Sequence, residues 1–342
     1  MNIQPPFYLR SYATEGVKEL LQKVTLGTNG ARYRHLDTLV RLKDLENPLY
    51  LSLEPKDKVL ANVTLCRRQV GWYIRYFAFE PSLQSEGNTR RKQSDGLLKQ
   101  ELSRFFQDAF NQKNAPDLMY AYIDPRNERS LWMSSNFGFK TKAKISTQTF
   151  SRIRPKEVKN VIEITEDLAW LKEKINETFK NHSLFFTKHT FNDTPFYGYY
   201  EDGVCKAFLK THRANWVVER LPGRSGRVLT QIIPYVPGLR KIVRPSEFSF
   251  TAIEAVYLEK GASIEYLNRL FEGVLFHEKT NSIIWWVDQK DPLYHKVANK
   301  LNWGLLHKLN GANEVDLVVL ERHNDRPQGL KQPYYTTAFD FI

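Results

Sequence analysis

One stretch of the sequence, residues 118–139, constrains the fold more than any other. It begins with a six-residue apolar run that ends at Asp124-Pro125, and a proline cannot continue the hydrogen bonding of a central strand. A short amphipathic segment follows and ends at Gly138, a residue type that helices use for a left-handed stop. The stretch therefore predicts a buried strand, a short helix, and a further strand close to Phe139.

Hydrophobic periodicity extends this pattern over the first half of the chain. Apolar runs bounded by polar breaks predict strands at residues 7–11, 49–53, 59–66, 72–79, 118–123 and 141–153. Apolar residues on one helical face predict helices at residues 15–24 and 97–110. A helix connects the strands at 72–79 and 118–123, so we expect those two strands to run parallel.

The second half repeats the same order of elements. Strands are expected at residues 161–165, 196–200, 204–212, 248–258 and 282–287, with a final hairpin of 305–308 and 315–320; helices are expected at 168–179, 264–277 and 293–301. The segment 213–247, rich in Arg, Gly and Pro, does not fit the repeat and is either a substrate lid or partner arm or a plain surface loop. We therefore expect an α/β fold with mixed sheets and two domains, 1–155 and 156–342.

The central stretch resembles a known family. A strand, Asn127, a helix and Gly138-Phe139, with eleven positions from Asn127 to Gly138, are similar to the C-terminal acyl-CoA-binding segment of GNAT-superfamily acetyltransferases. The element order of both halves is also similar to the GNAT order. The resemblance implies two tandem GNAT-like domains: the first binds acyl-CoA, and the second is degenerate and either structural or acceptor-binding.

The resemblance also implies a cofactor site in the first domain. Asn127 would lie beside the pantetheine arm of acetyl-CoA or another acyl-CoA, although it would also suit the N-cap of the following helix. Backbone amides at the end of the strand 72–79 would polarise the thioester carbonyl, and the turn before the next helix would hold the pyrophosphate. The candidates are Phe77, Ala78 and Phe79 for the carbonyl, and Arg90, Arg91, Lys92, Ser94 and Gly96 for the phosphates.

That phosphate turn departs from the family pattern, because only Gly96 remains of its glycines. Glycines allow the backbone to approach phosphates closely. Positive charge on the neighbouring residues would have to compensate, and the alternative is an N-capped helix that follows a solvated basic run.

Two residues are candidates for proton transfer. Glu80 follows the strand 72–79, at a place where family members often carry a carboxylate, and would take the proton of an acceptor amine. Ser134 stands where the family usually has a tyrosine that protonates the thiolate, and a serine hydroxyl is the weaker acid. An exposed strand-end carboxylate without a catalytic role is the alternative for Glu80.

Charge and cysteine content limit the remaining possibilities. The net charge is +12, of which +10 lies in residues 1–155, so the first half suits a polyanion such as a phosphorylated cofactor or RNA. The two cysteines and eight scattered histidines form no metal-binding pattern, and no apolar run has the length of a signal peptide core or a membrane span. We expect a cytoplasmic protein without a metal.

The sequence thus predicts a CoA-dependent N-acyltransferase, most simply an acetyltransferase, that acts on a small-molecule or peptide amine. Two other functions stay open. One is a tandem GNAT-like protein that has lost transfer and senses a ligand or binds a partner. The other is RNA binding by the basic first half, which ranks last because no nucleic-acid-binding motif accompanies the charge.

Overall fold

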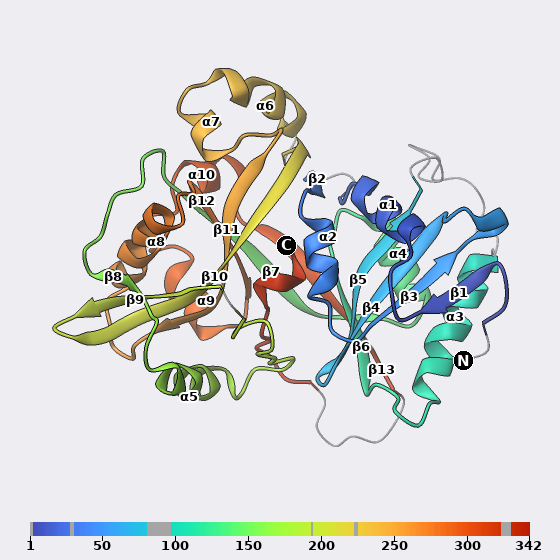
Figure 1. Ribbon diagram of the computed structural model, residues 1–342. Helices are drawn as coiled ribbons and strands as arrows, with labels where there is room; N and C mark the ends of the chain where they lie inside the picture. The colour runs from blue at the N-terminus through green and yellow to red at the C-terminus, as the bar shows by residue number, and fades with distance from the viewer. Residues whose placement is uncertain (1–2, 28–30, 81–96, 193, 222–224, 323–329) are drawn as a thin grey trace.

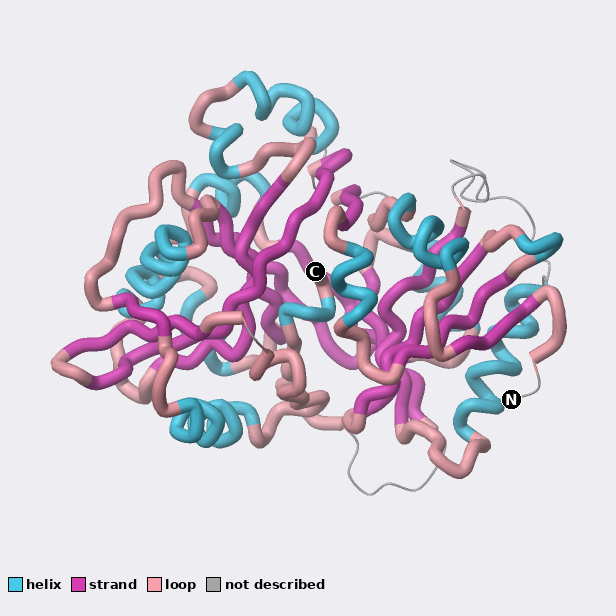
Figure 2. Tube along the Cα trace, in the orientation of Figure 1, coloured by secondary structure: helices cyan, strands magenta, loops and turns pink. Residues whose placement is uncertain are grey.

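The computed structural model describes residues 3–27, 31–80, 97–192, 194–221, 225–322 and 330–342. Its strands form one 13-stranded sheet with helices on both faces (Figures 1 and 2). The mixed α/β architecture expected from the sequence is confirmed. Across the sheet the strands are β1 (Phe7–Arg10), β3 (Pro48–Leu53), β4 (Ala61–Arg68), β5 (Gly71–Phe79), β6 (Leu118–Ile123), β13 (Asn313–Glu321), β7 (Lys140–Ser151), β12 (Ser282–Asp288), β11 (Phe248–Leu258), β10 (Val204–Arg220), β9 (Phe196–Glu201) and β8 (Val161–Glu163), and β2 (Arg32–His35) pairs with β10 off this path.

The two halves of the chain exchange their last strands. β13, near the C-terminus, pairs with β6 of the first half, whereas β7 of the first half pairs with β12 of the second. β7 and β13 also pair with each other and so lie at the centre of the sheet. Each half therefore completes its sheet with a strand from the other half. The domain boundary at residue 155 stays a prediction.

In the first half, the parallel strands β5 and β6 separate after a short stretch of pairing. Trp72 pairs with Met119 and Tyr73 with Tyr120, after which the two strands diverge; we call this separation the first gap. The register between β4 and β5 shifts at Arg75, which is one extra residue on β5. Such a bulge bends its strand and increases the local twist, which helps β5 to leave β6. The parallel pairing expected from the sequence is confirmed.

The second half contains the equivalent separation. β11 and β12 are parallel and pair from Thr251↔Ile283 to Ile253↔Trp285, and we call their separation the second gap. β11 also carries an extra residue relative to β10 near Ala255, whose φ is +50°. The internal repeat predicted from element order thus extends to the bulge beside each gap.

Helices cover the two faces of the first half. α1 (Glu15–Lys23) begins after Thr14, whose hydroxyl caps the Val17 amide, and it packs with α2 (Thr38–Lys43) on the face that carries Tyr73 and Tyr120. α3 (Leu97–Phe110) and α4 (Glu128–Asn136) cover the opposite face. Alternation along β6 explains this division, because Met119 belongs to the α3 side and Tyr120 to the α1 side.

In the second half, α8 (Glu265–His277) and α9 (Pro292–Val297) pack on one core, and α5 (Leu168–Phe179) packs on another. The insertion after β10 holds α6 (Gly226–Ile232) and α7 (Leu239–Ile242), at the top of Figure 1. β10 itself runs to Arg220, so the expected insertion 213–247 begins later than predicted.

The predicted hairpin of residues 305–308 and 315–320 is wrong, because the first of these segments is the helix α10 (Leu305–Asn310). Its leucines suit a helix as well as a strand. The Leu306 amide donates to the Ser151 hydroxyl at 3.0 Å, which holds the first turn of this helix against β7. Residues 305–308 are compatible with a helix or a strand, and the contact of Leu306 with Ser151 on β7 favours the helix.

The C-terminal segment, residues 330–342, returns between the two halves after β13 (Figure 1). The Tyr334 amide donates to Asp288 of β12 at 2.8 Å, and Asp340 accepts from Arg68 of β4 at 2.6 Å. The segment is therefore bonded to both halves and closes the sheet from one face.

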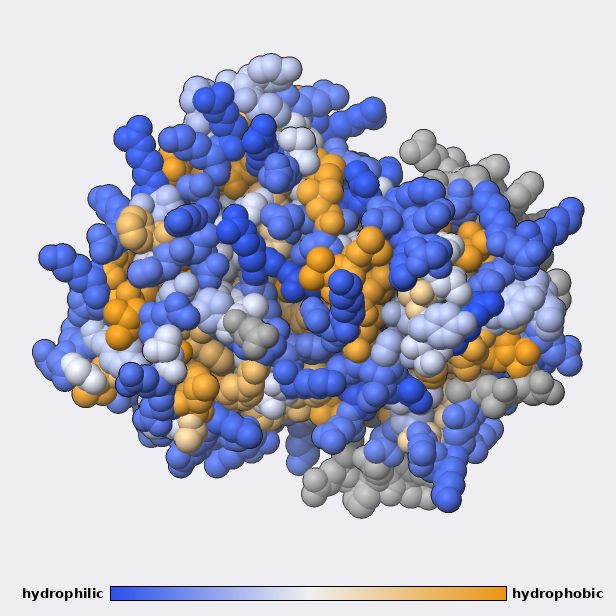
Figure 3. Space-filling view, in the orientation of Figure 1, coloured by the Kyte–Doolittle hydropathy of each residue, from blue (hydrophilic) through white to orange (hydrophobic). Residues whose placement is uncertain are grey.

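The surface seen in Figure 3 is mostly hydrophilic, and hydrophobic side chains gather over α2, where Leu39 and Val40 are exposed. Among the described residues, the longest apolar helices fall short of what a membrane crossing requires.

Candidate functional site

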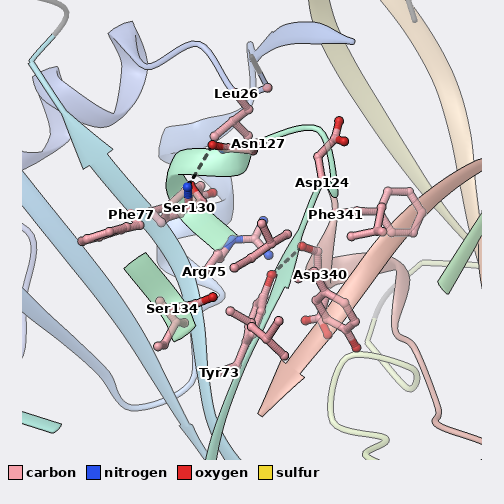
Figure 4. A pocket seen from close by; sticks show the side chains of 18 of the residues that line it. Leu26, Tyr73, Arg75, Phe77, Asp124, Asn127, Ser130, Ser134, Asp340 and Phe341 are labelled. Atoms are coloured by element: carbon pink, nitrogen blue, oxygen red, sulfur yellow. Dashed lines mark hydrogen bonds between the residues drawn. The ribbon is translucent and has the colours of Figure 1, made fainter. Parts of the chain in front are cut away.

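A cavity of about 310 Å³ lies in the first gap. Phe106, Met133 and Phe137 line it on the side of α3 and α4, and Tyr33 and Trp216 line it on the opposite face of the sheet. Figure 4 shows Ser130 and Ser134 on one side of the gap and Asp340 and Phe341 on the other. The cavity therefore passes between β5 and β6 from one face of the sheet to the other. A linear ligand can thread such a passage.

The end of β5 presents backbone amides to this passage. The Glu80 amide donates at 2.8 Å to the carbonyl of Leu60, the residue just before the neighbouring β4, so alternation directs the amides of Phe77 and Phe79 away from β4 and toward the first gap. Phe77 lines the cavity, whereas Phe79 and the buried Ala78 do not. Of the three predicted amides, Phe77 is the one positioned to bond a ligand in the cavity.

α4 places Asn127 and Ser134 on the cavity wall. Asn127 is the N-cap: its side-chain oxygen accepts from the Ser130 amide at 3.1 Å, which is the structural role that the sequence allowed. The Ser134 hydroxyl donates to the Leu131 carbonyl at 2.9 Å. Gly138 has φ = +88° and ends the helix as expected. The predicted strand, helix and glycine stop are confirmed. The side chains of Asn127 and Ser134 both reach the cavity.

Two carboxylates follow the ends of the strands that border the first gap, and they differ in their surroundings. Glu80 lies outside the cavity lining, and its carboxylate is 3.8 Å from the Lys58 ammonium. Asp124, at the end of β6, lines the cavity and is bonded to the Arg126 guanidinium at 2.8 and 2.9 Å. The sequence singled out Glu80, and the structure adds Asp124 as a carboxylate inside the cavity.

The predicted phosphate-binding residues Arg90, Arg91, Lys92, Ser94 and Gly96 lie outside the described residues. α3 begins at Leu97, directly after them. Their role stays a prediction.

Buried polar residues hold the C-terminal segment against the gap. Asp340 accepts from Arg68, and its backbone oxygen accepts from the Tyr73 hydroxyl at 2.7 Å. The Arg75 guanidinium donates to the backbone oxygens of Phe339 and Ile342. Burial raises the pKa of Tyr73 well above its ordinary value, so this phenol keeps its proton at neutral pH. Hydrogen bonds therefore fix this wall of the gap, and its Tyr73 phenol is neutral.

Sequence reasoning missed three residues at the opposite end of the cavity. Tyr33 and His35 of β2 and Trp216 of β10 line it with nearly parallel rings, and Tyr33 and Trp216 stack with centroids 4.1 Å apart. The alternation of residues 32–35 is a strand signal that is visible in the sequence. It does not indicate the pairing with β10, which brings together residues about 180 positions apart.

The second gap is lined by different residues and contains a smaller cavity. A cavity of about 200 Å³ lies there, lined by Tyr257, Asp288 and the C-terminal segment itself. The Thr336 hydroxyl donates to the Trp286 carbonyl at 2.7 Å, and the Tyr334 amide donates to Asp288. The chain's own C-terminal segment therefore bonds the groups beside this gap.

No protein-family model and no curated protein matches the sequence. Solved structures do match the fold. N-myristoyltransferase of Saccharomyces cerevisiae with bound myristoyl-CoA is 8% identical with a TM-score of 0.54, over 93% of this chain and 83% of that one. A GCN5-related N-acetyltransferase of Sphaerobacter thermophilus is 10% identical with a TM-score of 0.50, over 94% of this chain and 97% of that one.

A candidate acetyltransferase of Pyrococcus horikoshii is 10% identical with a TM-score of 0.53, over 99% of this chain and 97% of that one. These identities are too low to carry a substrate or an activity, but the likeness spans nearly the whole chain. The repeated gap, bulge and strand order agree with it. The chain has the fold of the GNAT acyl-CoA N-acyltransferases, built twice in a single sheet.

Proposed function

We propose that the protein transfers an acyl group from acyl-CoA to an amine, and that acyl-CoA binds in the first gap. The observation that carries the proposal is the cavity that crosses the sheet between β5 and β6. It would admit the pantetheine arm from the α3 and α4 side and the amine from the opposite side. The neighbours that bind myristoyl-CoA or are described as acetyltransferases support acyl-CoA as the co-substrate.

Acyl-CoA supplies the acyl group as a thioester. The Phe77 amide, which faces the first gap, would stabilise the negative charge that develops on the carbonyl oxygen. Asn127 and Ser134 on α4 would contact the pantetheine arm. The phosphates would be held before α3 by Arg90, Arg91, Lys92 and the amides of Ser94 and Gly96.

Transfer also requires that protons move. The amine nitrogen forms the new C–N bond and loses a proton, while the C–S bond breaks and the thiolate gains one. Glu80 is the proposed base, acting directly or through a water, and Asp124 is the carboxylate that competes for this role. Glu80→Gln and Asp124→Asn separate the two, because the variant that lacks the base loses kcat while its acyl-CoA affinity stays near that of the parent.

The departing thiolate also needs a proton donor. Ser134 lines the cavity, but its hydroxyl hydrogen is donated to the Leu131 carbonyl. A thiol with a pKa of roughly 8.5 is a tolerable leaving group without an acid, so transfer remains feasible at a reduced rate. The same observation favours the second candidate function, a GNAT-like protein that binds acyl-CoA and senses or signals without transfer.

One experiment tests the proposal and separates the two functions. Acetyl-CoA and longer acyl-CoAs are titrated calorimetrically, and thiol release is then measured with a panel of polyamines, amino acids, aminosugars and peptide N-termini. Binding with acceptor-dependent thiol release supports the enzyme, and binding without release supports the sensing protein. Absence of binding refutes both.

A triple variant tests the proposed phosphate-binding residues separately. Replacement of Arg90, Arg91 and Lys92 by Ala removes three charge-assisted contacts and should weaken CoA binding at least about tenfold. Unchanged affinity would remove these residues from the site.

A further inference from the structure

The insertion between β10 and β11, residues 221–247, is not used by the proposed acyl transfer, and none of its described residues lines the cavity of the first gap. Its helices α6 and α7 lie beyond the ends of these two strands, at the top of Figure 1. Leu229, Ile233, Leu239 and Ile242 pack against a hydrophobic core that β11 helps to form. These inward side chains hold the insertion on the sheet, and they fix which of its other side chains point outward.

The outer side of α6 carries exposed apolar side chains. Val228, Ile232 and Tyr235 are 55%, 48% and 86% exposed, and they follow one another along α6 and the 3₁₀ turn Ile233–Tyr235 that continues it. Residues three and four positions apart lie on the same side of a helix. A surface helix normally turns its apolar side to the core and a polar side to solvent. This segment is apolar on both sides, and we call its three outer residues the apolar face.

Positive charge accompanies the apolar face. Residues 221–246 contain five basic residues and no acidic residue, in a chain that has 38 Asp and Glu among its 342 residues. Arg227 directly precedes the apolar face, and α7, which contacts the turn that contains Tyr235, carries Arg240 and Lys241. These three basic side chains are exposed and form no ion pair or side-chain hydrogen bond within the described part of the chain. The surface therefore suits a partner that is both apolar and negatively charged.

The composition of this surface narrows the class of partner. Proteins that bind nucleic acid combine basic side chains with aromatic rings that stack on bases, or with polar groups that contact base edges. Val228 and Ile232 are aliphatic and offer neither. Aliphatic side chains and a tyrosine beside Arg and Lys are typical of segments that lie in the interface of an anionic membrane. There the apolar side chains enter the boundary between headgroups and acyl chains, and the cations approach the lipid phosphates.

We propose that the insertion is a docking surface for an anionic phospholipid membrane. The apolar face would enter the bilayer interface, and Arg227, Arg240 and Lys241 would contact the lipid phosphates. Three side chains bury little apolar surface, so the binding is peripheral and reversible. The proposal stands without the acyl transfer, because it uses no residue of the first gap.

Co-sedimentation of the full chain with vesicles tests the proposal. Vesicles of phosphatidylcholine that contain about 30% phosphatidylserine should bind the protein at least about tenfold more tightly than vesicles of phosphatidylcholine alone, because each basic side chain near an anionic surface contributes to binding. Absence of binding to the anionic vesicles, or equal binding to both compositions, overturns the proposal.

The apolar face needs its own variant, because anionic vesicles attract any basic protein. Ile232→Ser combined with Tyr235→Ser removes apolar surface and should weaken binding at least about tenfold. Both side chains are exposed, so the melting temperature should stay that of the parent. The matched control is Leu168→Ser combined with Tyr12→Ser, at residues that are 54% and 65% exposed outside the insertion, and it should not change binding. Equal affinities of the parent and the Ile232 and Tyr235 variant would show adsorption by charge alone and overturn the proposal.

The basic side chains are tested with Arg240→Gln combined with Lys241→Gln. This variant should bind about tenfold or more weakly at low ionic strength, and its difference from the parent should shrink as salt is added. Lys172→Gln combined with Lys180→Gln removes the same charge from α5 and its C-cap, far from α6 and α7 in Figure 1, and should have little effect. Equal losses in the two double variants would show that the vesicles respond to total charge, and would contradict the proposal.

A folded protein or an RNA as the partner would give other results. A bilayer interface accommodates tryptophan as well as tyrosine, so Tyr235→Trp should bind anionic vesicles at least as tightly as the parent. Loss of vesicle binding in Tyr235→Trp would indicate a shape-specific protein interface and overturn the proposal. Binding of single-stranded RNA that Ile232→Ser with Tyr235→Ser leaves unchanged, while anionic vesicles do not bind, would assign the surface to nucleic acid and equally overturn it.

Discussion

The first and second gaps arise from the same local structure and hold different contents. Each lies between two parallel strands, and each is bordered by a strand with one extra residue. The first contains a cavity of about 310 Å³ that crosses the sheet, whereas the second contains about 200 Å³ and is lined by the C-terminal segment. The repeat therefore supplies two potential binding sites, and the chain's own C-terminal segment borders the second.

The manner in which the C-terminal segment is held also differs between the gaps. Beside the first gap, bonds from Tyr73 and Arg75 to backbone oxygens are joined by a buried ion pair between Arg68 and Asp340, with side-chain exposures of 1% and 2%. Beside the second gap the contact consists of bonds to backbone groups, from the Tyr334 amide to Asp288 and from Thr336 to the Trp286 carbonyl. Loss of one partner should therefore lower the free energy of unfolding more for the buried ion pair beside the first gap than for either bond beside the second gap.

The largest expected effect follows from that ion pair. Arg68→Met leaves the carboxylates of Asp340 and Glu46 buried without their guanidinium and should lower the free energy of unfolding by about 3–5 kcal/mol. Thr336→Val removes one neutral hydrogen bond beside the second gap and should cost about 0.5–1.5 kcal/mol. Urea unfolding of both variants measures the difference, and equal losses would contradict the contrast between the two gaps.

A matched pair of substitutions tests which gap binds acyl-CoA. Ser134 lines the first cavity and Thr178 the second, and each hydroxyl donates to a carbonyl of its own helix, at 2.9 and 2.7 Å. Ser134→Trp fills the first cavity and should weaken acyl-CoA binding about 100-fold, while Thr178→Trp should leave it unchanged. The reverse result in calorimetry would move the cofactor site to the second half.

The pH dependence of stability is the next effect in size. His35 has a pKa of about 3 in the folded protein, below the roughly 6.5 of an unfolded chain, so the unfolded state takes up the proton first. The contribution of neutral His35 is complete above pH 6.5 and is lost progressively as the pH falls toward 3. Between pH 7.5 and 5 the loss should be about 2 kcal/mol.

His35→Phe removes that term, so urea unfolding of this variant should vary less with pH than unfolding of the parent over the same range. Parallel pH curves for the two proteins would show that His35 is already partnered at the wall of the first gap.

Much of this fold could be predicted from the sequence because much of it is local. The periodicity of residues 118–123, the cap at Asn127 and the stop at Gly138 each depend on neighbours a few positions away, and all three are confirmed. The exchange of β7 and β13 depends on pairing between residues about 130 to 200 positions apart. Periodicity describes each strand and contains no information about its partner.

The residues of the candidate site also fall into two groups, those that the sequence predicted and those that only the fold brings together. Asn127, Ser134 and the Phe77 amide were predicted from the resemblance to a known family, and all three residues line the cavity. His35 and Trp216 were not, because they become neighbours only when β2 of the first half pairs with β10 of the second. Asp124 was visible as the end of a strand, but its place inside the cavity depends on how far β5 and β6 diverge.

The central claim is that one of two related gaps binds acyl-CoA. The most direct measurement is the stoichiometry of acetyl-CoA or myristoyl-CoA binding by calorimetry on the full chain, repeated on Ser134→Trp. The account predicts one molecule bound per chain, and none bound by the variant at the same ligand concentration. Two molecules per chain, or undiminished binding by Ser134→Trp, would contradict it.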